Sequence, residues 1–135
     1  MKTQAIDRRS FIAASSTFTA GLAWTAASQA RVAGSNDRIA IGLIGCGGRG
    51  SALRQEVLRH AEAANARVVA ACDIWDAMRE QAAQHVADIQ DAAPKKYADY
   101  KELLAHEGLH AVVIATLDHQ HPIMLRDAAR AKLDA

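Results

Sequence analysis

The chain has 135 residues, of which 50% are apolar and 4% aromatic, a composition typical of a small globular domain. The chain has 16 basic and 15 acidic residues, and its first thirty residues contain three of the basic ones (Lys2, Arg8 and Arg9) and one acidic one (Asp7). Residues 31–135 therefore contain 13 basic and 14 acidic residues. This balanced remainder excludes the basic surface that nucleic-acid binding requires. The length sets an upper limit of one domain.

The amino terminus resembles a twin-arginine export signal. The segment Asp7-Arg8-Arg9-Ser10-Phe11-Ile12-Ala13 fits that consensus except at its first and last positions, and a mildly apolar stretch leads to a small-x-small pattern at Ser28-Gln29-Ala30. We expect residues 1–30 to be a signal peptide recognised by the twin-arginine export machinery, residues 31–37 to be a linker, and the protein to be periplasmic or otherwise exported. The alternative is an uncleaved membrane anchor, although the stretch falls short of the roughly 20 strongly apolar residues that a span needs.

Apolar runs and amphipathic segments alternate along residues 38–135. Runs at 39–44, 68–72 and 111–115 are typical of parallel strands covered on both faces, and Tyr97 marks a short strand after Pro94. Helical spacing follows each strand, with Arg54 expected on a solvent-facing side, Asp99 opening the third helix, and Gly108 closing it. The order β-α-β-α-β-α-β-α predicts an α/β fold, a doubly wound parallel sheet whose ligand lies at the carboxyl ends of the strands.

The loop Gly45-Cys46-Gly47-Gly48-Arg49-Gly50 matches the G-x-G-x-x-G pattern between a strand and a helix, the context of dinucleotide binding. Gly45 permits the tight turn, Gly47 lets the backbone approach a pyrophosphate, and Gly50 permits close packing of the helix against the strand. Free amides at the start of the helix face the anion. Arg49 either adds a charge-assisted contact or points to solvent.

Asp73 follows the second strand, 23 residues beyond Gly50, about the offset of a carboxylate that accepts hydrogen bonds from the adenosine ribose. An acidic group there repels a 2′-phosphate, which favours NAD over NADP. The alternative for Asp73 is a helix N-cap. Trp75 either packs near the adenine or lies in the core or on the surface.

The segment Thr116-Leu117-Asp118-His119-Gln120-His121 resembles the Thr-Pro-Asp-His-x-His loop of the glucose-fructose oxidoreductase / inositol dehydrogenase (Gfo/Idh/MocA) family. The glycine loop, Cys72-Asp73-Ile74-Trp75 and Tyr97-Ala98-Asp99-Tyr100 are similar to other segments of its exported members, so the resemblance covers Arg38–Ala135. It implies a Rossmann-type domain of an NAD(P)-dependent oxidoreductase for sugar or polyol substrates, with Thr116 and His121 against the nicotinamide-side ribose and phosphates. Full-length relatives are expected to be homo-oligomers. Leu117 and Gln120 replace a common Pro and Trp, which predicts a looser or reshaped loop.

The same resemblance implies a Glu-Lys-Pro motif on a fifth strand and a second, substrate-binding α/β domain, and the sequence contains neither. We therefore expect a partial Rossmann domain, truncated after the fourth strand-helix unit, with no catalytic residue and with the fourth strand as an unpaired edge. Two alternatives remain open. One is a catalytically inactive nucleotide-binding fragment, and the other is an S-adenosylmethionine-binding, methyltransferase-like domain that shares the glycine loop and the carboxylate after the second strand.

The cysteines and histidines suggest no metal site. Cys46 and Cys72 lack metal-ligand or redox spacing, so we expect both to be buried, with a disulfide between them as the alternative. His119 and His121 belong either to the ligand loop or to a solvated loop, and no Cys or Glu is placed to complete a zinc site with them. The remaining histidines are expected at surface positions: His60, His85, His106 and His110.

Overall fold

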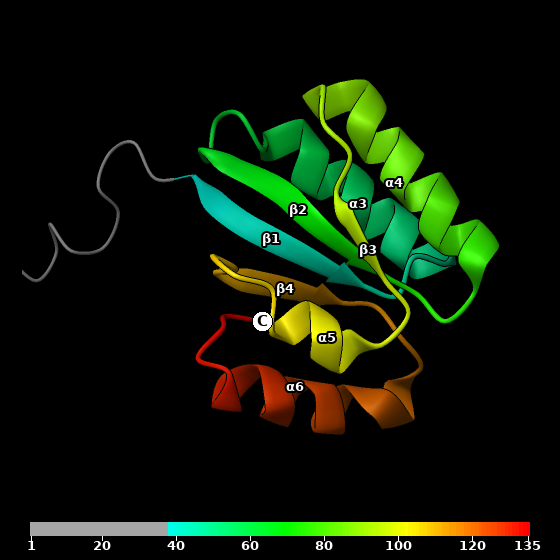
Figure 1. Cartoon of the computed structure of the whole chain (residues 1–135), viewed down its shortest axis with the longest axis vertical. Helices are drawn as coiled ribbons and strands as arrows, with labels where there is room; N and C mark the ends of the chain where they lie inside the picture. Colours follow the sequence, from blue (N-terminus) through cyan, green and yellow to red (C-terminus); the bar gives the residue numbers. More distant parts are fainter. Residues whose placement is uncertain (1–37) are drawn as a thin grey trace, which may run out of the picture. The chain divides into compact units, whose positions relative to one another are not determined.

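The computed structural model describes residues 38–135 (Figure 1). The expected signal peptide and linker, residues 1–37, lie outside the described residues. The strands are β1 (Ile39–Ile44), β2 (Ala66–Cys72), β3 (Lys95–Tyr97) and β4 (Ala111–Ile114), and the helices are α3 (Gly48–His60), α4 (Asp76–Gln90), α5 (Tyr100–Leu104), the 3₁₀ turn η1 (Asp118–Gln120) and α6 (His121–Arg130). They form one parallel sheet in the order β3-β2-β1-β4, which confirms the predicted doubly wound α/β fold.

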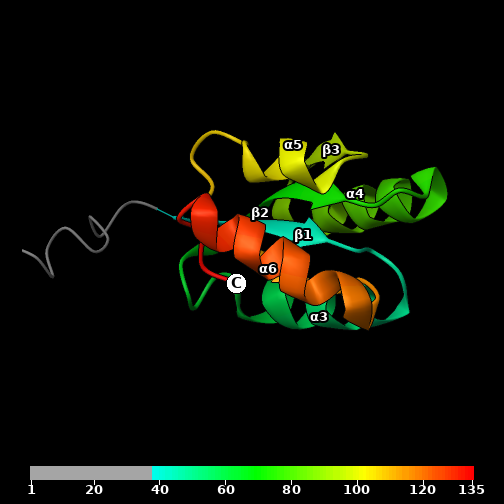
Figure 2. The same ribbon diagram turned by 90° about the horizontal axis from the view of Figure 1, so that it is seen from below.

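Helices cover both faces of the sheet, as Figures 1 and 2 show. On β1, Leu43 packs with residues of α3 and α4, whereas its neighbour Ile44 packs with residues of α5 and α6. This split follows from the alternation of side chains along a strand. Both faces of β1 are therefore buried, which explains why its sequence is a continuous apolar run.

The pairing of β2 with β1 contains a bulge. Ile41 pairs with Val68 and Gly42 with Ala70, so Val69 is an extra residue. The bulge changes which residues of β2 face each layer, because an inserted residue shifts the two-residue alternation by one. Beyond it, Ala71 packs towards α4 and Cys72 packs towards α5.

The third helix is shorter than the sequence predicted. Asp99 caps it as expected, accepting a hydrogen bond from the Lys101 amide at 2.8 Å. The helix ends at Leu104, and Gly108 lies in a separate turn with φ of +76°. A left-handed φ favours glycine wherever the chain turns, so Gly108 marked a turn rather than the helix end.

The outer edge of β4 is partly paired, contrary to the prediction of an unpaired edge. The Val112 amide donates to the Asp134 carbonyl at 2.8 Å, and the Asp134 amide donates to the His110 carbonyl at 3.1 Å. Asp134 thus forms a parallel bridge with Ala111. Within residues 38–135, none of the helices is long and apolar enough to cross a membrane.

Candidate functional site

A cleft of about 800 Å³ opens at the carboxyl edge of the sheet. Its walls come from the loops that follow β1, β3 and β4 and from the end of β2. The volume lies in the range of roughly 300–1,000 Å³ typical of ligand pockets. Six of the ten residues predicted to bind a cofactor line it: Gly45, Gly47, Gly48, Arg49, Asp73 and Thr116.

The glycines of the loop after β1 meet different constraints. Gly45 has φ of +89°, and a Cβ there would lie 2.6 Å from the Ala115 carbonyl oxygen. A Cβ on Gly50 would lie 1.9 Å from the Gly45 carbonyl oxygen, so the start of α3 packs against the end of β1 with no room for a side chain. Gly47 has no atom within 4 Å of such a Cβ, which leaves open space beside its backbone on the cleft side.

The amino terminus of α3 leaves backbone amides free towards this cleft. The first hydrogen bond of the helix runs from the Ser51 amide to the Gly47 carbonyl at 2.7 Å. No side chain caps the helix, and its first turn holds no acidic residue. The partial positive charge of a helix amino terminus, with its free amides, favours an anion at this position.

Asp73 lies at the end of β2 and joins the cleft to the glycine loop. Its Oδ2 accepts a hydrogen bond from the Cys46 amide at 2.7 Å, and its Oδ1 accepts one from the Trp75 amide at 2.9 Å. The N-cap of α4 is Trp75, so Asp73 is not the helix cap considered as an alternative. Each carboxylate oxygen has a second lone pair, so both can still accept a ligand hydroxyl.

Cys46 and Cys72 are both free and buried, as expected, and the alternative disulfide is not present. Cys46 packs with Ala71 and Ala82, while Cys72 belongs to the core on the other side of the sheet. Burial raises the pKa of the Cys46 thiol to about 11 and that of Cys72 to about 12. Cys46 therefore contributes its backbone amide to the site while its thiol stays neutral below the loop.

The loop after β4 is closed by a side chain. His121, the first residue of α6, bonds through Nε2 to the Thr116 carbonyl at 3.0 Å, and because a carbonyl accepts, Nε2 carries the proton. Leu117 has φ of −70° and ψ of 144°, a conformation that proline also adopts. The Gln120 amide bonds to the Leu117 carbonyl at 2.8 Å. Leucine therefore takes here the backbone geometry that proline would fix.

The other predicted residues contribute indirectly or lie outside the cleft. Cys46, Gly50 and His121 shape its walls without lining it, and Trp75 is 63% exposed beside it. The cleft is also lined by residues that the sequence did not single out as cofactor ligands: Ile44, Cys72, Ile74, Ala98, Asp99, Tyr100, Ala115, Leu117, Gln120 and Met124. Asp99 could have been found, because it follows β3 as Asp73 follows β2. Among residues 38–135, no group of three or more His, Cys, Asp or Glu residues could hold a metal ion.

Three of the histidines expected at surface positions have specific partners. His85 Nδ1 accepts from Arg54 Nε at 3.1 Å, His106 Nδ1 bonds to the Tyr97 hydroxyl at 2.8 Å, and the exposed His110 accepts from the Ala40 amide at 3.0 Å through Nδ1. His110 is nevertheless exposed as expected, whereas His85 and His106 are only partly exposed beside their partners.

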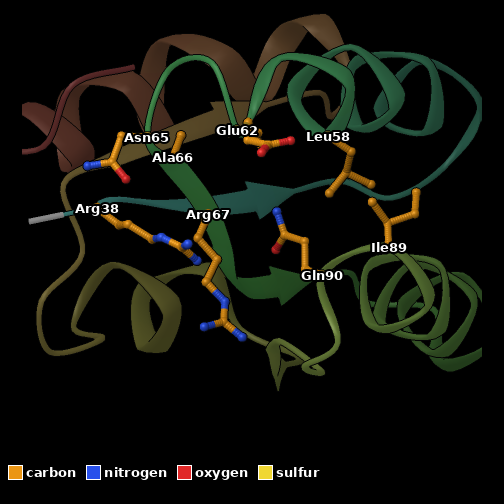
Figure 3. A pocket seen from close by; sticks show the side chains of 9 residues that line it. Arg38, Leu58, Glu62, Asn65, Ala66, Arg67, Ile89 and Gln90 are labelled. Carbon is orange, nitrogen blue, oxygen red and sulfur yellow. The ribbon is translucent and has the colours of Figure 1, made fainter. Parts of the chain in front are cut away.

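A second cavity, of about 270 Å³, lies at the opposite edge of the sheet, at the amino end of β2 and the carboxyl ends of α3 and α4. Figure 3 shows the Arg67 side chain pointing away from Glu62, while the Arg38 side chain runs beside β1 towards Arg67. The side-chain oxygen of Gln90, Oε1, accepts a hydrogen bond from the Val68 amide at 3.2 Å. This cavity is smaller than the cleft at the carboxyl edge, and it lies at the edge opposite to the one where open α/β sheets bind ligands, so it is the weaker candidate.

A family model described as the oxidoreductase family (Gfo/Idh/MocA) with an NAD-binding Rossmann fold matches residues 39–134. The chain belongs to this family. No match was found among curated proteins. The family match and the sheet order together identify residues 39–134 as an NAD-binding Rossmann domain.

Solved structures share the fold. The scyllo-inositol dehydrogenase of Lactobacillus casei, solved with NAD(H) and scyllo-inositol, is 20% identical with a TM-score of 0.61 over 71% of this chain and 26% of its own. The WlbA dehydrogenase of Chromobacterium violaceum, solved with NADH and UDP-GlcNAcA, is 21% identical with a TM-score of 0.63, and the match covers 73% of this chain and 26% of the WlbA chain. An NAD-binding oxidoreductase of Klebsiella pneumoniae is 28% identical with a TM-score of 0.58, and the match covers 71% of this chain and 26% of the Klebsiella chain. The chain thus spans about a quarter of the length of these relatives.

Proposed function

We propose that residues 38–135 bind NAD in preference to NADP, as the dinucleotide-binding part of an exported oxidoreductase for sugar or polyol substrates. The observation that carries this proposal is the placement of two complementary groups in one cleft. The uncapped amino terminus of α3 suits a pyrophosphate, and the Asp73 carboxylate suits a ribose diol.

The residues present fit such a cofactor. Open space beside Gly47 lets a pyrophosphate approach the free amides of α3, and Arg49 on the cleft wall adds a cation for the phosphates. Thr116, positioned by His121, lies on the same wall for the nicotinamide-side ribose. Bound NAD supplies the hydride acceptor of the reaction. The described residues bind and orient it.

The preference for NAD rests on charge. Asp73 places a carboxylate where a 2′-phosphate would lie if the adenosine ribose sat at the end of β2, and like charges at that distance repel. Arg79, a cation beside the end of β2, donates to the Asp73 carbonyl and to the Asp76 carboxylate. These contacts leave Arg79 poorly placed to accommodate the extra phosphate.

The substrate class and the location are proposed on separate grounds. Two of the solved relatives are described with an inositol and with a nucleotide-linked sugar acid, which supports a polyhydroxylated substrate for this chain. Arg8 and Arg9 support export by the twin-arginine pathway. That pathway suits a nucleotide-binding protein because it carries folded proteins.

The alternatives receive less support. An S-adenosylmethionine-binding domain shares the glycine loop and Asp73, but the family matched over residues 39–134 is NAD-binding. A nucleotide-binding module without catalysis has the same cleft, and it differs from the proposed function in showing no substrate-dependent reduction of NAD.

Calorimetric titration of the full chain with NAD, NADP and S-adenosylmethionine tests the proposal. We expect NAD to bind at least about tenfold more tightly than NADP, since one like-charge contact is removed. Tighter binding of NADP would reassign Asp73, and binding of S-adenosylmethionine alone would favour the alternative.

A further inference from the structure

Arg54 is a charged side chain that the fold buries, with 4% of its surface exposed. This corrects the expectation that it faces solvent. Arg54 Nε donates to His85 Nδ1 in α4 at 3.1 Å, and Arg54 Nη2 donates to Ser51 Oγ at 3.1 Å. Because His85 Nδ1 accepts the bond, that nitrogen carries no proton. Both partners of the guanidinium are thus uncharged acceptors.

No carboxylate of residues 38–135 forms an ion pair with Arg54, since the ion pairs of this region involve other side chains. Burial lowers the pKa of the guanidinium, but arginine starts so far above neutrality that it remains charged. A buried cation whose partners are uncharged is unfavourable, because no counter-ion offsets the loss of its hydration. A side chain that only linked α3 to α4 would not need to carry a positive charge, so the charge of Arg54 calls for another explanation.

The charge lies beneath the amino terminus of α3. Helical side chains lean towards the amino end of their helix, and the Ser51 that Arg54 contacts belongs to the first turn. The Ser51 amide makes the first hydrogen bond of α3, to Gly47 at 2.7 Å. The positive charge of Arg54 also opposes the rise in the pKa of Cys46, the thiol beneath the glycine loop. Arg54 therefore acts on the loop whose amides face the cleft.

We propose that Arg54 is a buried cation that strengthens phosphate binding at the α3 amino terminus without touching the ligand. This inference rests on the dinucleotide-binding function proposed above. Solvent screens charges in the protein interior less than exposed charges. The positive charge of Arg54 therefore adds to the positive end of the helix dipole. An anion at the loop in turn offsets the unfavourable burial of the guanidinium.

Three variants of the full chain separate charge from hydrogen bonding: Arg54→Met, Arg54→Gln and Arg54→Lys. Calorimetry measures binding of NAD and ADP, and ligand-observed NMR measures binding of adenosine, which has no phosphate. Arg54→Met and Arg54→Gln should bind NAD and ADP about three- to tenfold more weakly with adenosine affinity unchanged, while Arg54→Lys keeps most of the affinity.

Arg59→Met is the matched control, because it removes an exposed arginine from the same helix, with 62% of its side chain accessible. It should leave all three affinities unchanged. Equal NAD affinity in the wild type, Arg54→Gln and Arg54→Met would overturn the inference while leaving the proposed function intact. Parallel losses of NAD and adenosine binding would overturn it as well, by showing a structural role. Failure of the wild type to bind NAD at all would instead contradict the proposed function.

Discussion

The carboxylate of Asp73 holds the backbone amide of Cys46 at 2.7 Å, which fastens the end of β2 to the glycine loop. A residue read from the sequence as a ribose ligand thus also shapes the loop that receives the pyrophosphate. The two functions are compatible because a carboxylate oxygen accepts more than one hydrogen bond.

Replacing Asp73 with Asn should weaken NAD binding at least about tenfold and remove the preference over NADP, because the repulsion of a 2′-phosphate disappears with the charge. Calorimetry with both cofactors measures the change. Asp88→Asn, an exposed carboxylate on α4 bonded to Gln84, is the control and should leave both affinities unaltered. An Asp73→Asn protein that still discriminates against NADP would contradict this role.

Two glycines of the same loop should respond differently to alanine. Gly50→Ala places a Cβ 1.9 Å from the Gly45 carbonyl oxygen, so we expect a loss of about 2 kcal/mol or more in the free energy of unfolding. Gly48→Ala meets no atom within 4 Å and should change stability by about 1 kcal/mol or less. Urea unfolding of both variants provides the comparison. Equal stabilities would show that the close contact at Gly50 is not rigid.

Leu117→Pro should stabilise the chain by about 0.4–1 kcal/mol, because the folded backbone already has φ of −70° and proline restricts the unfolded state. Thermal or urea unfolding tests it. Leu117→Gly, which frees the unfolded state, should have the opposite effect. If proline destabilised the protein, the loop after β4 would need a conformation different from the one observed.

The two buried thiols should make the fold less stable in alkali. The pKa values rise in the folded state from 9.0 to about 11 for Cys46 and about 12 for Cys72, because burial opposes ionisation. This contribution to stability is fully present below pH 9 and is lost as pH rises through the folded-state values, since the unfolded thiols ionise first. Unfolding from pH 8 to 11 in the wild type and a Cys46→Ala, Cys72→Ala double variant measures it. The double variant should show the flatter profile, and identical profiles would refute the assignment.

Export provides a prediction for residues outside the described region. Replacing Arg8 and Arg9 with Lys should leave the full-length precursor in the cytoplasm, because the twin-arginine pathway requires this pair. Immunoblots of cytoplasmic and exported fractions measure the distribution. Unchanged export would assign the amino terminus to another pathway.

The sequence predicted the strands, their parallel pairing and the glycine loop because these features repeat locally along the chain. The spacing of Gly50, Arg54 and Leu58, every four residues on one face of α3, also indicated that Arg54 is buried. The prediction that Arg54 faces solvent was wrong because it relied on the charge of the side chain instead of this spacing. Other features could not be predicted. The bonds from Asp73 to Cys46 and from Arg54 to His85 join residues 27 and 31 positions apart, and such partners are set by how the elements pack.

The central claim is that the α3 amino terminus and Asp73 form one dinucleotide site, and an amide NMR titration of the full chain with NAD tests it most directly. We predict that the largest shifts occur at the amides of Gly47, Gly48, Arg49 and Gly50, with accompanying shifts at Asp73 and Thr116. Residues of the opposite edge, such as Arg67 and Gln90, should not move. Shifts concentrated at that edge, with none in the glycine loop, would contradict the claim.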